Sequence, residues 1–128
     1  MVGFAHAHIK VLIMSNVIED KTLSYSNRIV KLYNYLVQEK GEYVLSKQIL
    51  RSGTSIGSNV AEAQDAQSKK DFVSKMSIAL KETSETKYWL KVLYNGGYIS
   101  EQQFHSVYDD TCELHKIISS IVLTTKEN

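Results

Sequence analysis

The sequence predicts an all-α protein, an antiparallel up-and-down four-helix bundle, and three observations support this fold class. The chain has 128 residues with no proline and only six glycines, a composition that favours long uninterrupted helices over a loop-rich β-sheet protein. From Asn16 onward, apolar residues recur with the period of an α-helix. Four such segments of similar length are joined by short turns, and helices connected in this way pack antiparallel to their chain neighbours.

The N-terminal residues differ from the rest of the chain. Asn16 and Glu19 have the spacing of a capping box, so we expect the first helix to begin near residue 17. Residues 1–14 are therefore predicted to be an N-terminal extension outside the core, and residues 15–128 to form the four-helix bundle domain.

Neither a signal peptide nor a membrane span is expected. His6, His8 and Lys10 interrupt the apolar N-terminal stretch, which in a signal peptide is continuous. No apolar run in the chain is long enough to cross a bilayer. We therefore expect a cytoplasmic protein with no membrane partner.

The first two expected helices differ in how they end and pack. The first covers about residues 17–40 and is followed by Gly41, a residue typical of helix C-termini. The second covers about residues 44–67 and contains Gly53 and Gly57 in its interior. Each of these glycines costs roughly 1 kcal/mol relative to alanine, which indicates a bend or a close approach to a neighbouring helix.

Serine caps define the starts of the third and fourth expected helices. Ser68 and Asp71 have capping-box spacing, and this helix stops at the Asn-Gly-Gly of residues 95–97. Ser100 and Gln103 have the same spacing at the start of the last helix.

Motifs that usually carry catalysis are incomplete in this chain. Residues 53–57 match the G-x-S-x-G motif of hydrolases, but that motif needs a strand before the serine and the period here is helical. Di-iron bundles use Glu-x-x-His pairs, whereas this chain has Glu82-x-x-Glu85 and no Glu-x-x-His. Cys112 is the only cysteine, which excludes a cysteine-based zinc cluster. We therefore expect no catalytic residue, no metal ion and no cofactor, and a protein that is not an enzyme.

Charge is unevenly distributed along a chain whose formal net charge is only +1. Residues 21–51 are mainly basic, whereas residues 101–113 are acidic. Three interpretations stay open: ordinary solvated helix faces, a basic groove for RNA or DNA, or contacts of opposite sign between subunits. Because the third helix starts beside the end of the second, cations of the first two helices and of the third can converge, giving weak, salt-sensitive binding. The candidate nucleic-acid contacts are Lys31, Lys47, Arg51, Lys69, Lys70 and Lys75.

Aromatic and polar side chains of the second and third helices indicate contacts beyond the core. Tyr88 and Trp89 are adjacent, so they cannot both face one core stripe, and one is expected to face a partner subunit or a second layer of packing. Arg51, Asn59 and two carboxylates, Glu82 and Glu85, lie among small residues. We expect them to form a buried or interface polar network that fixes helix register. The chain is therefore predicted to be a homo-oligomer.

The stretch from Leu45 to Leu93 resembles the four helix bundle protein family, also called the 23S rRNA intervening-sequence protein family. The most specific part is R-S-x-x-S-I-x-x-N-x-A-E-A, followed by E-x-x-E-T-x-Y-W-L, and the resemblance covers about residues 16–125. The motif residues singled out as candidates are Arg51, Ser52, Ser55, Asn59, Glu62, Glu82, Glu85 and Trp89.

This resemblance implies a compact bundle that assembles into a ring-like homo-oligomer, most often a pentamer. The family is similar to accessory proteins of diversity-generating retroelements, which bind nucleic acid and a reverse transcriptase. Two hypotheses follow: a non-enzymatic oligomeric bundle with weak RNA association, or an accessory nucleic-acid-binding subunit of a reverse transcriptase. Basic and acidic residues are equal in number from Met14 onward, unlike the basic accessory proteins, which favours the first hypothesis.

Overall fold

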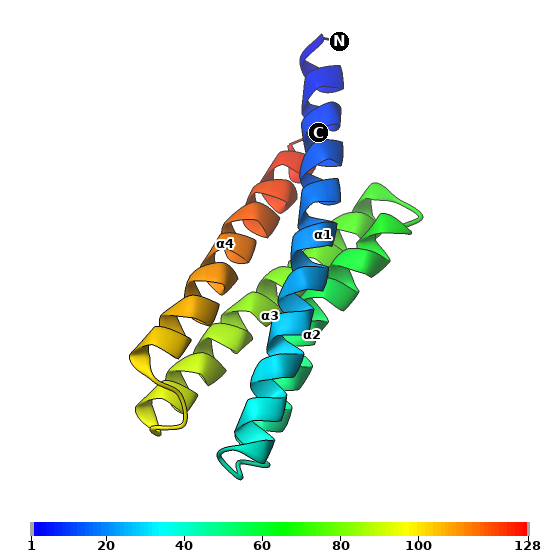
Figure 1. Ribbon diagram of the computed structural model, residues 1–128. Coiled ribbons are helices and arrows are strands. Elements are labelled where there is room, and N and C mark those ends of the chain that lie inside the picture. The colour runs from blue at the N-terminus through cyan, green and yellow to red at the C-terminus, as the bar shows by residue number, and fades with distance from the viewer. Residues whose placement is uncertain (1, 128) are drawn as a thin grey trace.

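The computed structural model describes the main chain of residues 2–127 and the side chains of residues 9–127. Within that range the protein forms four helices and no strand, which confirms the all-α prediction. Each helix packs against its chain neighbour and the last packs against the first, so the helices alternate in direction around one core (Figure 1). The helices are α1 (Val2–Gln38), α2 (Leu45–Gln64), α3 (Lys69–Asn95) and α4 (Glu101–Lys126).

All four helices contribute aliphatic side chains to the core. These side chains recur every three or four residues, as the sequence pattern indicated, and the largest of them are fully enclosed. Removing this apolar surface from water is the main force holding the bundle together. The fully enclosed members include Ile18, Ile29 and Leu36 of α1, Ile49, Ile56 and Val60 of α2, Met76, Leu90 and Leu93 of α3, and Ile118 and Ile121 of α4.

The first helix starts far earlier than the sequence indicated. It runs unbroken from Val2 through Asn16, so the expected capping box of Asn16 and Glu19 is wrong. Val11 and Met14 lie partly buried against the core, and this packing favours continuation of the helix over a cap. In Figure 1 the first turns of α1 project beyond the ends of the other helices. The division into an extension and a core domain stays a prediction.

The turn between α1 and α2 combines one expected feature and one unexpected one. Gly41 has a φ of 60°, and the Glu42 main-chain N–H donates to the Leu36 oxygen (2.9 Å), so the glycine ends α1 as predicted. The buried Glu42 carboxylate then accepts hydrogen bonds from the main-chain N–H groups of Val44 and Leu45. These amides are free at a helix N-terminus, so Glu42 supplies the cap of α2.

The two glycines of α2 permit a close approach to α1. A methyl group added at Gly53 would lie 2.8 Å from Ile29, a distance that real side chains do not tolerate. At Gly57 it would lie 3.1 Å from the Ser26 hydroxyl and 3.3 Å from Thr22. The sequence indicated either a bend or a close approach to a neighbouring helix at these glycines, and the structure shows the close approach.

The serine caps of α3 and α4 form as predicted, with one difference. Ser68 accepts a hydrogen bond from the Asp71 main-chain N–H (3.0 Å), and Ser100 accepts one from that of Gln103 (3.1 Å). Gln103 completes its box by accepting from the Ser100 N–H (2.8 Å). The Asp71 carboxylate accepts instead from the Gln67 N–H (3.4 Å), so that box is only half formed.

Candidate functional site

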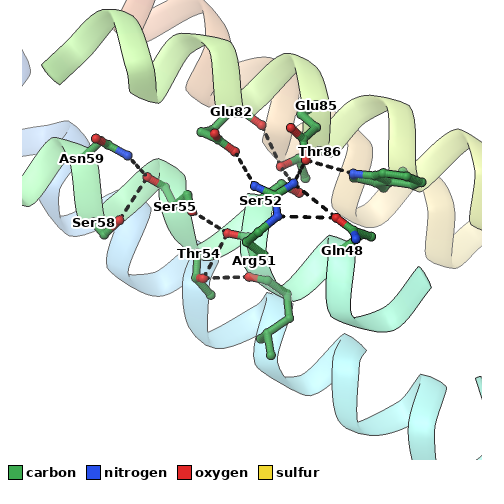
Figure 2. A network of polar contacts seen from close by, with 12 residues as sticks. Gln48, Arg51, Ser52, Thr54, Ser55, Ser58, Asn59, Glu82, Glu85 and Thr86 are labelled. Carbon is green, nitrogen blue, oxygen red and sulfur yellow. Dashed lines mark hydrogen bonds and ion pairs between the residues drawn. The ribbon is translucent and has the colours of Figure 1, made fainter. Parts of the chain in front are cut away.

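A group of polar side chains lies where α2 and α3 pack together, and we call Gln48, Arg51, Glu82, Glu85 and Trp89 the polar seam (Figure 2). The Arg51 guanidinium contacts the Glu85 carboxylate directly and lies 3.6 Å from Glu82. Gln48 accepts from Arg51 at 3.4 Å, and the Trp89 indole donates to Glu85 at 3.1 Å. The seam therefore joins the two helices through charged hydrogen bonds.

Small residues beneath the seam allow α2 and α3 to approach closely. Ser52 of α2 and Thr86 of α3 are fully buried where these helices meet. The Thr86 hydroxyl lies 3.1 Å from that of Ser52 and donates to the main-chain oxygen of Glu82 (2.8 Å). Paired hydroxyls in a close contact fix the register of one helix against the other.

The seam carries one more negative charge than positive charge. Glu82 and Glu85 share the single guanidinium of Arg51, and one Glu82 oxygen is buried without a hydrogen-bond partner. The Arg51 side chain is 50% exposed and that of Glu82 only 15%. Solvent screens the exposed half of this arrangement, so it adds more to specificity than to stability.

The remaining motif residues are arranged around the seam without joining it. Asn59 was expected in the network but instead donates to the Ser55 main-chain oxygen one turn earlier in α2 (2.8 Å). The Ser55 hydroxyl likewise donates to the main-chain oxygen of Arg51 (2.6 Å). Glu62 forms a separate ion pair with Lys75 of α3 (3.2 Å). The motif thus contains one shared cluster and several local contacts.

The candidate nucleic-acid contacts are not gathered in one place. Lys31 and Lys47 lie near the turn between α1 and α2, whereas Lys69 and Lys70 begin α3 at the other end of α2. The 20 residues of α2 separate the two groups by roughly 30 Å. The structure therefore does not bring the two groups together in one molecule. Arg51 and Lys75 of the candidate set are already paired with carboxylates.

Some of the unevenly distributed charges pair with one another inside the molecule, because cations of α1 contact carboxylates of α4. Lys21 pairs with Glu113 at 2.6 Å, and Arg28 contacts Asp110 directly. The hydrogen bond and charge of Glu113 raise the pKa of Lys21 above its ordinary value. The opposite signs of the first and fourth helices were visible in the sequence, but which side chains meet was not. Intramolecular ion pairs are thus a fourth interpretation, beyond the three that the sequence left open.

A second polar contact lies in the interior of the same interface. The Tyr25 hydroxyl is 2.6 Å from that of Thr111, and both residues are buried. Burial raises the pKa of Tyr25 well above its ordinary value, so this hydroxyl stays protonated.

No catalytic constellation forms among the described residues. The serine of the G-x-S-x-G match, Ser55, lies inside α2 with its hydroxyl bonded to its own helix. His115 is hydrogen-bonded to the Thr83 hydroxyl of α3 (2.8 Å). Within residues 9–127, histidine, cysteine and acidic side chains form no group of three or more that is able to hold a metal ion. Over the part of the chain that is described, the helices lack the combined length and apolarity needed to cross a bilayer.

Tyr88 and Trp89 face different surroundings, as the sequence required. Tyr88 is 59% exposed, whereas Trp89 is half-buried against the core and bonded to Glu85. Their rings pack edge to face with centroids 5.1 Å apart. An exposed aromatic side chain thus lies directly beside the polar seam.

Comparison with known proteins agrees with the resemblance drawn from the motif. The chain matches the family model described as 23S rRNA-intervening sequence protein over residues 14–120. It is also similar to a crystal structure from Bacteroides thetaiotaomicron, described as a protein with unknown function from the S23 ribosomal protein family. The two share 51% sequence identity and a TM-score of 0.85, over 86% of this chain and 98% of that one. No curated protein is significantly similar to the chain.

Proposed function

Because the chain belongs to the 23S rRNA-intervening sequence protein family, we propose that it is a non-enzymatic bundle that acts by self-association, with a pentamer as the first expectation. The observation that carries this proposal is the surface of α3 beside the polar seam. Tyr88 is 59% exposed and Ile78, one turn before Glu82, is 40% exposed. Exposed aromatic and other large apolar side chains are enriched at protein interfaces.

A second copy of the chain would complete contacts that one copy leaves open. The seam has two carboxylates and one guanidinium, and the Glu85 side chain is 33% exposed, so a cation of a second copy would reach it. Residues 21–38 of α1 contain three basic residues and no acidic residue; Lys21 and Arg28 are paired with α4, whereas Lys31 forms no ion pair with the described side chains. Charges of opposite sign on two surfaces of one chain favour head-to-tail contacts, which close into rings when the rotation permits.

Replacing Tyr88 with glutamate tests this surface. We expect Tyr88→Glu to dissociate the oligomer, since a charged side chain at the interface would lose its hydration. Tyr43→Glu is the matched control, because Tyr43 is also 59% exposed but lies in the turn before α2. Light scattering after size exclusion measures the mass. If both variants dissociate the oligomer, or if neither does, the surface around Tyr88 is not the interface.

Weak RNA association is the second part of the proposal. Copies packed side by side repeat Lys31 and Lys47 along one rim, and Lys69 and Lys70 along the other, which concentrates charge that one molecule spreads over two ends. Each phosphate neutralised contributes about 0.9 to the salt dependence of duplex binding, so a few lysines per copy give binding that salt removes. An accessory role beside a reverse transcriptase needs a larger basic surface, and no contact among the described residues favours it.

RNA titrations at about 50 and 200 mM salt test this second part. We expect binding at the lower salt, its loss at the higher salt, and its loss in Tyr88→Glu because the rim needs the oligomer. Tight binding that resists salt would contradict a purely electrostatic role. No binding at low salt would leave self-association as the only supported activity.

A further inference from the structure

We propose that a cavity at one end of the bundle binds a small amphipathic anion, a medium-chain carboxylate. This end cavity has a volume of 430 Å³ and is lined by the N-terminal half of α1, the α2–α3 turn, the start of α3 and the end of α4. It lies at the opposite end of α2 from the turn that contains Glu42. Ligand-binding cavities in proteins commonly have volumes in this range.

The walls of the end cavity are suited to a hydrocarbon chain. Val11 and Leu12 of α1 face it, together with Ala63 of α2 and Phe72 of α3. Leu12 is 55% exposed, so an apolar ligand lying there would remove its side chain from water. The apolar part of a ligand therefore gains affinity here without any specific contact.

A buried hydroxyl without a partner points to a polar ligand atom in the same cavity. Ser15 lines it and is only 3% exposed, yet its side-chain oxygen makes no hydrogen bond. A buried polar group left in this state is costly, and an oxygen of a bound ligand would satisfy it. Ser46 has a similar unpaired hydroxyl, but it lies at the start of α2, at the other end of the bundle.

The charge at the cavity mouth selects an anion. Lys69, the first residue of α3, lines the cavity. Its side chain is exposed and forms no ion pair with the described side chains. Lys69 is the only charged residue among the described residues that line the cavity. The nearby Asp71 carboxylate is occupied by the Gln67 N–H of the preceding turn. The Lys69 ammonium and the Ser15 hydroxyl are both hydrogen-bond donors on the lining, and a carboxylate supplies acceptor oxygens only.

Isothermal titration calorimetry of the full chain with sodium octanoate tests the proposal. We expect saturable binding of one octanoate per chain, and much weaker binding of octylammonium, which has the same chain with the opposite charge. Lys69→Ala should weaken octanoate binding by about fivefold, the upper range for an exposed ion pair. Lys70→Ala is the matched control, because Lys70 is adjacent but does not line the cavity. Equal losses in both variants would overturn the assignment.

Two further variants separate a specific site from general adsorption. Ala66→Leu, in the turn after α2, places a larger side chain in the cavity and should abolish binding, whereas Ala61→Leu, on the exposed face of α2, should not. Ser15→Ala removes the unpaired hydroxyl, so it should weaken octanoate binding while leaving the protein at least as stable. Melting temperatures show that each variant is folded. Failure of folded wild-type protein to bind octanoate overturns the proposal, whatever the oligomeric state.

Discussion

At the scale of single residues, two positions of α2 are closely constrained by the side chains around them. Arg51 supplies the only cation of the polar seam, and Gly53 occupies a position at which any side chain would meet Ile29. Both residues lie on the same helix, two positions apart, and they face different partners. Changes at these positions therefore separate electrostatic from steric contributions to the bundle.

Arg51→Ala should lower the free energy of unfolding by about 1–2 kcal/mol, because the Glu82 and Glu85 carboxylates are then left together without a cation. Lys47→Ala, an exposed α2 residue without an ion-pair partner, should change stability by less than about 0.5 kcal/mol. Urea unfolding measures both variants. Adding Glu85→Gln to Arg51→Ala should recover part of the loss, and no recovery would show that the pair is not coupled.

Gly53→Ala should lower stability although alanine is the better helix former. The gain in helix propensity is about 1 kcal/mol, whereas an overpacked contact such as that with Ile29 costs about 1–3 kcal/mol. Gly57→Ala meets only contacts of 3.1 Å and longer, so it should be close to neutral. Thermal unfolding of the two variants compares them directly. A Gly53→Ala protein more stable than wild type contradicts the close packing described here.

His115 predicts a specific dependence of stability on pH. Burial, and then the charge of Lys87, lowers the pKa of His115 below its ordinary value of about 6.5. The unfolded chain therefore binds this proton more readily, so stability decreases as pH falls below about 6.5. His115→Gln should remove this part of the pH dependence, and the exposed His105→Gln should not. Unfolding curves between about pH 5 and 8 measure it. An unchanged dependence in His115→Gln would show that other groups cause it.

At the scale of helices, the sequence predicted the boundaries that local residues determine. Ser68, Ser100 and Gly41 act within one turn of their own helix, so their spacing was sufficient. The cap of α2 was missed because glutamate is not one of the residue types preferred at helix N-caps, although its contacts with Val44 and Leu45 are local. The start of α1 was missed because packing against other helices overrides the capping tendency of Asn16.

In the candidate site, too, some contacts could be predicted from the sequence and others depend on how the helices pack. That Arg51, Glu82 and Glu85 would meet could be inferred from charge and small neighbours on two adjacent helices. Which α1 cation meets which α4 carboxylate depends on the rotation of each helix about its axis. Sequence periodicity leaves that rotation uncertain, so the Lys21 and Arg28 ion pairs were not predicted.

A truncated chain tests the division between residues 1–14 and the bundle. Removing residues 1–13 deletes Val11, which lies partly buried against the core, but leaves Ile18 and all later core residues. We expect the truncated protein to fold with a melting temperature lower by about 3–6 °C, equivalent to about 1 kcal/mol. Circular dichroism during heating measures this change. An unfolded product would show that the N-terminal turns belong to the core.

At the scale of the whole molecule, the charges and the apolar surface indicate the same mode of action. Ion pairs between α1 and α4 neutralise much of the charge that set these helices apart in the sequence. The four candidate nucleic-acid contacts that form no ion pair with the described side chains, Lys31, Lys47, Lys69 and Lys70, are divided between the two ends of α2, whereas Ile78 and Tyr88 of α3 are exposed. A surface of this kind is suited to association with another protein more than to enclosing a polyanion.

Sedimentation equilibrium at micromolar concentration measures directly whether copies of this chain bind one another. We expect a single species whose mass is a whole multiple of the 14.5 kDa chain, with five copies as the first expectation. A homogeneous 14.5 kDa monomer under these conditions would contradict it.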